Sequence, residues 1–438
     1  MLTTQTACRH TPKAQGSNPF ATVEKMTLPN GLEVLFYPNP ASPVVCVHFW
    51  CRTGSRNEPQ EWAGISHFFE HMFFKGSKNY GVGAMDRLIK SLGGYNNAFT
   101  SIEYTGYYVV LPAGNFTKAM DVLLDAIRFP AFDPKEINLE REVVREEINR
   151  KHDNPTGTQY EVFQNLIFQG SVYAPPVLGT AESVGRIDHD AFVTYLKSFY
   201  HPKNLCMIIA GDFDRAEVLA YIRQATDGWV GEAHPVLQEI PVKLLERDRP
   251  VEKVIEKETQ QSYGVTGYRY PGYAQPATHM ALDVASSMLA GGRSSRLYRR
   301  LYVQDNLVQS VSAWVWPQAE AGAFGINVVC PPANLERVRS IINEELQLFI
   351  REPWDPEELN KVKTKLIADF EMGTETANDV AQALGEAWVY GRVPTLVSYV
   401  TDVEALNEVQ IKAALRETLK PAGEVYVTVQ PPSSEPKE

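Results

Sequence analysis

The sequence predicts an α+β fold made of two homologous α/β-sandwich domains, each a mostly antiparallel sheet covered by helices. Two observations lead to this prediction. Segments typical of strands and of helices follow one another without strict βαβ alternation, which favours helices on one face of a largely antiparallel sheet. The second half of the chain also repeats landmarks of the first. Because 438 residues are too many for one ordinary core, two or more domains are expected.

The internal repeat is marked by two pairs of landmarks. In each half, a strand-like run ends in a Pro-containing turn and an Asn, and a long helical pattern then leads to Asp-Pro. The Asn residues, Asn115 and Asn334, are offset by 334 − 115 = 219 positions, and Asp133 and Asp355 by 355 − 133 = 222. The small drift predicts a short insertion in the intervening helix. A repeat of this size indicates duplicated domains rather than a solenoid.

Strands and helices follow from local patterns. Runs rich in β-branched and aromatic residues predict strands at 33–37, 44–50, 107–111 and 206–210. Asp133-Pro134 predicts the start of a helix, because Asp is a favoured N-cap and Pro suits the first turn.

The predicted domain boundaries follow composition. Residues 1–20 are expected to form a disordered leader, and the N-terminal domain spans 21–229. The proline-containing stretch 230–250 is predicted to be a linker. The C-terminal copy spans 251–430, and 431–438 is expected to be a disordered tail.

Composition limits the classes of function. The net charge of −11 argues against a nucleic-acid partner and suits basic or amphipathic peptides, although a solvated acidic surface is the commoner explanation. No apolar run reaches about 18 residues, so no membrane span is expected. Five cysteines without C-x-x-C spacing indicate free thiols in a reducing compartment. With no recognisable signal peptide, we expect a cytoplasmic protein, with an organellar or periplasmic location as the alternative.

The most informative motif is His67-Phe68-Phe69-Glu70-His71, an H-x-x-E-H pattern in an otherwise apolar helical segment. At about 100° per residue, the two His and the Glu share one sector of the helix. Burying these groups costs several kcal/mol unless something satisfies them. A zinc ion can bind both imidazoles, and Glu70 can then take a proton from water. Two satisfied core histidines flanking a Glu are the alternative interpretation.

A third ligand is expected because catalytic zinc usually takes three protein ligands. In the helix predicted to start at Asp133-Pro134, a buried stripe roughly 140° wide contains four apolar residues: Ile137, Val143, Val144 and Ile148. Glu140 and Glu147 fall within this stripe, whereas Glu142 and Glu146 point away. The helical wheel therefore selects Glu147 as the ligand, and Glu140 as a residue that orients a ligand from behind. A solvated, Glu-rich face is the alternative.

These motifs resemble those of the pitrilysin/insulysin family of inverzincin metallopeptidases, which includes processing peptidases. The family has a Glu about 76 positions after its second His, and here 147 − 71 = 76. Its E-x6-E helix matches Glu140 and Glu147. Its N-A-x-T-S segment matches 97–101, and its S-R-L-Y segment matches 295–298. The resemblance runs from about Leu28 to about Met372.

The resemblance implies a zinc-dependent metalloendopeptidase. His67, His71 and Glu147 would hold the zinc, Glu70 would be the catalytic base, and Glu140 would support a ligand. The substrate peptide would add to an edge strand formed by four matching residues: Asn97, Ala98, Phe99 and Thr100. On sequence alone, that segment could equally be a turn leading into the strand at 107–111. The second copy has no H-x-x-E-H motif, so the metal chemistry belongs to the first half.

The resemblance also implies a half-clamshell that encloses its chamber with a second one. Members with a complete site carry an Arg and a Tyr, seven positions apart, after S-R-L-Y; here Tyr302 and Gln309 occupy those places. The chain is therefore predicted to be the zinc-bearing subunit of a heterodimer whose homologous partner carries the Arg/Tyr pair, with a homodimer as the alternative. The rival from another class is a non-catalytic assembly subunit of the same fold.

Overall fold

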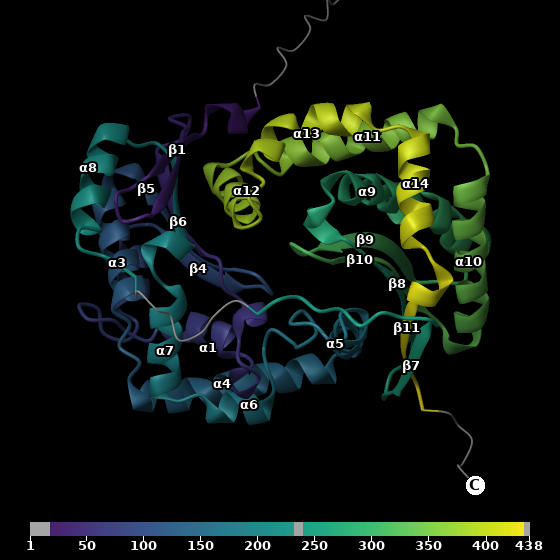
Figure 1. Cartoon of the computed structure of the whole chain (residues 1–438), viewed down its shortest axis with the longest axis horizontal. Coiled ribbons are helices and arrows are strands. Elements are labelled where there is room, and N and C mark those ends of the chain that lie inside the picture. Colours follow the sequence, from purple (N-terminus) through teal and green to yellow (C-terminus); the bar gives the residue numbers. More distant parts are fainter. Residues whose placement is uncertain (1–17, 232–239, 433–438) are drawn as a thin grey trace, which may run out of the picture.

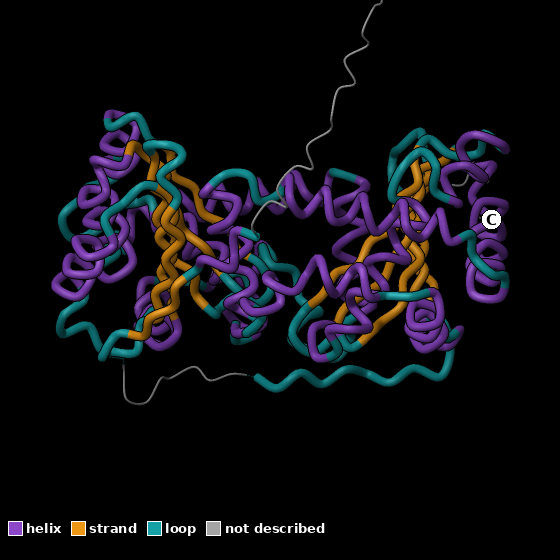
Figure 2. Tube along the Cα trace, turned by 90° about the horizontal axis from the view of Figure 1, so that it is seen from above, coloured by secondary structure: helices purple, strands orange, loops and turns teal. Residues whose placement is uncertain are grey.

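The computed structural model describes residues 18–231 and 240–432. Within them, two sheets lie at opposite ends of the molecule with helices packed on and between them (Figures 1 and 2). Helices and strands alternate irregularly along the chain, and the predicted α+β fold with two helix-covered sheets is confirmed. In the described residues, no helix combines the length and the apolar character needed to cross a membrane.

The first sheet has six strands in the order β1-β2-β6-β3-β5-β4, and only the β2–β6 pair is parallel. Its strands are β1 (Glu24–Thr27), β2 (Glu33–Pro38), β3 (Val44–Cys51), β4 (Tyr95–Thr100), β5 (Thr105–Pro112) and β6 (Leu205–Gly211).

The second sheet has five strands in the order β7-β11-β8-β10-β9, and only the β7–β11 pair is parallel. Its strands are β7 (Val251–Glu256), β8 (Ser262–Tyr270), β9 (Ser310–Pro317), β10 (Gly322–Cys330) and β11 (Val425–Gln430). Apart from β1, both sheets have the same order and the same single parallel pair, as duplication requires.

Eight helices precede the linker: α1 (Ile65–Phe73), α2 (Ala84–Ser91), α3 (Phe116–Arg128), α4 (Pro134–Asp153), α5 (Pro155–Ile167), α6 (Ala181–Arg186), α7 (His189–Phe199) and α8 (Arg215–Ala225). Six follow it: α9 (Pro276–Ala290), α10 (Leu335–Arg351), α11 (Pro356–Met372), α12 (Ala377–Val389), α13 (Val393–Ala405) and α14 (Glu408–Thr418). Asp133 caps α4 and Asp355 caps α11, each accepting a backbone N–H. Between these landmarks α10 has 17 residues and α3 has 13, which accounts for the drift in the repeat.

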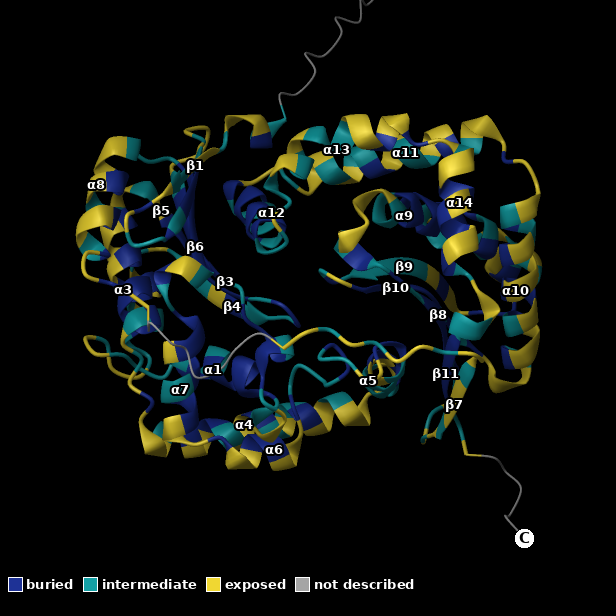
Figure 3. Cartoon of the chain, in the orientation of Figure 1, coloured by how far each residue is buried: buried dark blue, intermediate teal, exposed yellow. Residues whose placement is uncertain are grey.

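Each half lends one helix to the sheet of the other half. Helix α12 covers the face of the first sheet that bears Cys46, Trp50 and Ile208, while α1, α3 and α7 cover the opposite face. Reciprocally, α5 packs against Val265 and Val427 of the second sheet. The expectation that helices cover one face of each sheet is therefore wrong. The central strands are buried on both sides (Figure 3), which explains their nearly continuous apolar runs.

The predicted terminal segments and linker lie partly outside the described residues, which omit 1–17, 232–239 and 433–438. The leader was expected to reach residue 20, and this limit is wrong. The side chain of Asn18 donates hydrogen bonds to the carbonyls of Leu396 and Val397, both at 3.0 Å. Phe20 is buried, with its ring 5.7 Å from that of Phe370. These contacts attach the start of the described chain to the second half.

Candidate metal centre

Helix α1 is fixed at its N-terminus by a glycine and a buried carboxylate. Gly64 has a φ of 95°, and a Cβ there would lie 2.6 Å from the carbonyl oxygen of Leu178, so only glycine fits. The Glu58 carboxylate accepts the backbone N–H groups of Gly64 at 2.7 Å and Ser66 at 2.8 Å. Burial raises the pKa of Glu58 to about 7, and these hydrogen bonds only partly offset it. The start of the motif helix is thus set before any side chain of the motif is placed.

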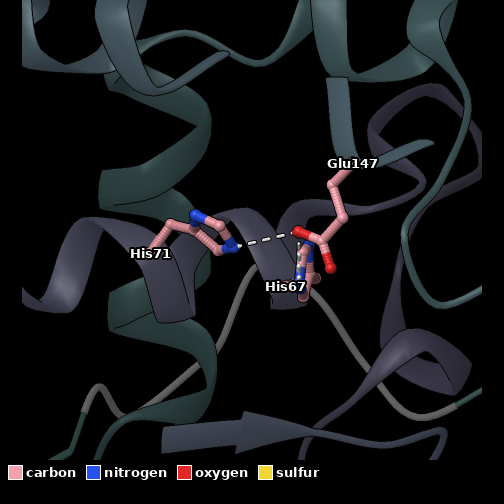
Figure 4. A group of neighbouring side chains, drawn as sticks. All are labelled: His67, His71 and Glu147. Atoms are coloured by element: carbon pink, nitrogen blue, oxygen red, sulfur yellow. Dashed lines mark ion pairs between the residues drawn. The ribbon is translucent and has the colours of Figure 1, made fainter. Parts of the chain in front are cut away.

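The structure brings His67, His71 and Glu147 together, with one possible ligand atom from each within 4.8 Å of the others. Glu147 Oε2 lies 3.6 Å from His67 Nε2 and 3.5 Å from His71 Nε2. Figure 4 shows both imidazoles directed at this carboxylate from one helix, with Glu147 reaching across from α4. Among residues 18–231 and 240–432, no other group of three His, Cys, Asp or Glu side chains meets this criterion.

His71 is oriented from behind by Glu140. Its Nδ1 lies 2.9 Å from Glu140 Oε1, and Lys75 Nζ lies 2.6 Å from Glu140 Oε2. Burial would lower the pKa of His71, but its hydrogen bonds with Glu140 and Glu147 outweigh burial and raise this pKa to about 9. A proton shared between Nδ1 and Glu140 leaves Nε2 as the nitrogen that faces Glu147. This is the arrangement in which an outer carboxylate orients a metal-binding imidazole.

His67 is held by burial. It is 8% exposed, and its Nδ1 is buried without a hydrogen-bond partner in the described chain. Burial, and then the neighbouring His71, lower the pKa of His67 to about 4, so the ring is neutral at pH 7. A neutral imidazole offers a lone pair, which is what a metal ligand requires. Two imidazoles and a carboxylate at these distances fit a divalent zinc ion.

Glu70 lies beside this group and points to the edge strand β4. Its Oε2 accepts a hydrogen bond of 2.7 Å from the hydroxyl of Thr100. Burial raises the pKa of Glu70, and the hydrogen bond from Thr100 partly offsets the effect. The carboxylate therefore sits where a metal group and a strand edge meet, with one oxygen held by the strand.

The segment 97–100 belongs to β4, the edge strand of the first sheet, so the interpretation of it as a turn is wrong. Asn97 is exposed and Ala98 is buried, as the alternation of a strand requires. The Phe99 ring lies 5.0 Å from the Trp50 ring and so close to Gly106 that a Cβ there would clash. Within the described residues β4 pairs only with β5, which leaves its other edge free for a further strand.

Two family models match consecutive parts of the chain. The model described as Insulinase (Peptidase family M16) matches residues 33–181, and the model described as Peptidase M16 inactive domain matches residues 186–366.

The chain belongs to the M16 peptidase family.

Relatives and solved structures agree with this assignment. An uncharacterized zinc protease of Streptomyces coelicolor is 26% identical, covering 92% of this chain and 89% of that protein. The uncharacterized zinc protease YmxG of Bacillus subtilis is also 26% identical, covering 90% of this chain and 95% of that protein. The crystal structure of a protease from Helicobacter pylori has a TM-score of 0.89 at 24% identity, covering 93% of this chain and 99% of that one. At this identity the structural match shows the fold alone.

The M16 chain departs from the helical-wheel prediction at one position. Val143 was placed in the buried stripe of α4, but it is 47% exposed. The stripe is narrower than predicted because α4 lies at the outside of the fold and packs one face on α1, α5 and α6. Glu140 is buried and Glu147 half-buried, whereas Glu146 is exposed, so the wheel separated these carboxylates correctly.

Sequence reasoning missed Lys75 and Glu58. Lys75 follows His71 by one helical turn, and this spacing could have suggested a cation near Glu140. Nothing local signalled that Glu58 folds back to cap α1. Tyr302 and Gln309, which occupy the places of the expected Arg/Tyr pair, are both exposed. The Tyr302 ring stacks on Tyr298 at 4.7 Å, within a π-helical stretch (Tyr298–Gln304).

Proposed function

We propose that this M16 chain is a zinc metalloendopeptidase that hydrolyses peptides or unfolded segments. The observation that carries the proposal is the meeting of His67, His71 and Glu147 from two helices, beside a buried Glu70. The relatives that are named zinc proteases support the same class of activity.

The zinc ligands in this proposal are His67 and His71 of α1 and Glu147 of α4. When bound, zinc supplies a positive charge that polarises the scissile carbonyl and acidifies water. Glu140 positions His71 through the Nδ1 contact of 2.9 Å, and Lys75 keeps Glu140 ionised. Burial would raise the pKa of Glu140, but its hydrogen bonds with His71 and Lys75 outweigh burial and lower it.

Glu70 is the proposed general base. Its buried environment raises its pKa, which brings its proton affinity closer to what a group that takes and returns a proton needs near neutral pH. Thr100 holds one carboxylate oxygen at 2.7 Å, which restricts its rotation and leaves the other oxygen for the water. Glu70 takes the proton from that water and later delivers it to the leaving amine.

The peptide is proposed to bind along the free edge of β4. Main-chain hydrogen bonds between an extended peptide and an edge strand give affinity with little dependence on side chains. Asn97, Ala98, Phe99 and Thr100 would line this edge, and the Thr100–Glu70 hydrogen bond connects it to the base.

The chain is further proposed to be the zinc-bearing subunit of a two-subunit peptidase. Tyr302 and Gln309 replace the Arg/Tyr pair expected from the family resemblance, so a homologous subunit would supply the missing donors. A non-catalytic assembly subunit remains the competing function; it predicts no hydrolysis with any partner.

Peptide hydrolysis with and without a metal chelator tests the proposal. The purified chain, mixed with a homologous subunit that carries the pair, is assayed on an unstructured peptide. Activity that disappears on chelation, returns with zinc and is absent from Glu70→Gln supports the proposal. Hydrolysis that is unaffected by chelation contradicts it.

A further inference from the structure

A pocket of about 260 Å³ lies between α5 and the second sheet. Its walls are aromatic: Tyr160 and Phe163 come from α5, and Trp314 and Trp316 come from β9. The Phe163 and Trp314 rings are 5.7 Å apart and perpendicular, and the Tyr160 and Trp316 rings are 5.1 Å apart. The size suits one large side chain rather than a whole cofactor.

Two polar atoms in the lining are buried without a hydrogen-bond partner in the described chain. One is a donor, the indole nitrogen Nε1 of Trp314, and the other is an acceptor, Oδ1 of Asn327. Each unsatisfied buried group costs free energy, so such pairs call for an explanation. A planar amide supplies both an acceptor and a donor and would satisfy the two atoms together.

The sequence places this donor and acceptor on the same face of the sheet. Trp314 of β9 is directly opposite Gly325 of β10, and Asn327 follows Gly325 by two residues on the same face. A Cβ on residue 325 would lie 2.3 Å from the Trp314 ring, so the indole can lie across β10 only because residue 325 is glycine. The glycine thus fixes the position of the indole in the pocket wall.

The pocket lies within peptide reach of the candidate metal centre. Lys151 follows Glu147 by one turn of α4, and its ammonium lies 5.9 Å from the centre of the Tyr160 ring. This path places the pocket wall on the order of 20 Å or less from Glu147, given about 1.5 Å of rise per helical residue. An extended peptide spans that distance with roughly six residues.

We propose that this aromatic pocket binds a large apolar side chain of the peptide substrate together with that residue's own main-chain amide. The side chain packs among Tyr160, Phe163, Trp314 and Trp316. The indole N–H of Trp314 donates to the peptide carbonyl, and Oδ1 of Asn327 accepts from the peptide N–H. The link to a substrate rests on the proposed peptidase function, whereas the binding chemistry of the pocket does not.

Binding of N-acetyl-phenylalanine amide to the full-length chain tests the pocket without any need for catalysis. We expect a Kd of about millimolar or tighter by ligand-observed NMR, and no measurable binding of N-acetyl-alanine amide. Asn327→Leu and Trp314→Phe each remove one polar atom and keep the bulk, so each should weaken binding about tenfold. Ser312→Ala is the matched control, because Ser312 is directly opposite Asn327 but exposed.

A stability measurement separates this role from a structural one. Since Asn327 Oδ1 has no partner in the described chain, Asn327→Leu should leave the melting temperature unchanged or raise it while binding falls. Equal binding of the phenylalanine and alanine compounds, or undiminished binding by the Asn327→Leu and Trp314→Phe double variant, overturns the proposal. Failure of wild type to bind at millimolar concentration also overturns it and indicates that water satisfies both atoms.

A peptide series then tests the link to the substrate. In otherwise identical peptides, one Phe is moved stepwise away from the cleaved bond, and KM should be lowest at a single separation of roughly four to six residues. Asn327→Leu should raise KM there about tenfold without changing kcat. Binding of the amide without any peptide hydrolysis would contradict the peptidase function and leave the pocket standing. Hydrolysis that is insensitive to the Phe position and to Asn327→Leu would contradict the substrate role of the pocket.

Discussion

His67 and His71 come from one helix, yet their surroundings prepare them differently. Burial lowers the pKa of His67 to about 4, and its Nδ1 has no partner in the described chain. In His71, hydrogen bonds with Glu140 and Glu147 outweigh burial and raise the pKa to about 9. Both rings nevertheless present Nε2 to the same carboxylate oxygen of Glu147. The site therefore depends on Glu147 more than on either imidazole alone, because Glu147 closes the group from the second helix.

Replacing Glu147 by Gln should reduce zinc binding strongly, because the amide removes the one negatively charged ligand while changing the shape little. Glu146→Gln is the matched control: the two positions are adjacent on α4, but Glu146 is exposed. Metal analysis of the purified proteins should find about one zinc per chain in wild type and Glu146→Gln, and far less in Glu147→Gln. Equal zinc loss in both variants, or loss only in Glu146→Gln, would contradict the assignment.

Replacing Glu70 by Gln should lower peptide hydrolysis by about 10² to 10⁴-fold, because the general base is lost. Zinc content should not change, since Glu70 lies outside the group of three possible ligands. The Thr100 hydroxyl can still donate to the amide oxygen, so the fold is expected to persist. The rate is measured on unstructured peptides beside zinc content and thermal melting. Near-normal turnover by a folded, zinc-loaded variant would exclude Glu70 as the base.

At the scale of the elements, the sequence allowed the chemistry of α1 and α4 to be predicted better than their packing. His67, Glu70 and His71 share a helix face by local geometry alone, and Glu147 was selected because its face of α4 was apolar. Val143 was misplaced because the width of a buried stripe depends on how many neighbours a helix has, which the wheel does not contain. The exchange of α5 and α12 between the sheets also depends on tertiary contacts that leave no local periodicity.

The docking of α12 on the first sheet depends on a helical glycine. A Cβ on Gly385 would lie 1.8 Å from the Trp50 ring, which is fully buried. Gly385→Ala should therefore destabilise the protein by about 1–3 kcal/mol through overpacking, although alanine favours helices by about 1 kcal/mol. Chemical denaturation measures the change.

The matched control is Gly185→Ala in α6, where the added Cβ meets only the flexible end of Arg145. This variant should be neutral or stabilising by up to about 1 kcal/mol. Equal responses of the two variants would mean that α12 does not dock closely on Trp50.

At the scale of the molecule, a buried carboxylate joins the two halves. Glu103, between β4 and β5, accepts from Arg56 at 2.5 Å and from the Tyr173 hydroxyl at 2.7 Å. Its second oxygen accepts the backbone N–H of Ala319 at 2.8 Å, in the turn between β9 and β10. Glu103→Ala leaves Arg56 buried without this partner and should cost about 3–5 kcal/mol of unfolding free energy. Glu320→Gln, at the exposed end of the same network, should cost less than about 1 kcal/mol. Similar losses in both variants would contradict the importance of the buried link.

The isolated chain should be a weak peptidase or inactive, and a homologous subunit that carries the Arg/Tyr pair should restore activity. Tyr302 and Gln309 stand where the pair is expected, and both are exposed, with Tyr302 stacked on Tyr298. Within the described residues the candidate metal centre is confined to the first half, so the second sheet brings no second site. A preorganised pair of oxyanion donors is worth several kcal/mol in the transition state, so its absence should lower kcat by orders of magnitude. The chain is assayed on unstructured peptides alone and after addition of the homologous subunit, with complex formation followed by sedimentation. The same subunit lacking its Arg and Tyr is the control, which should bind the chain but restore little activity. Full activity of the isolated chain, unchanged when Tyr302 and Gln309 are both replaced by Ala, would refute the heterodimer.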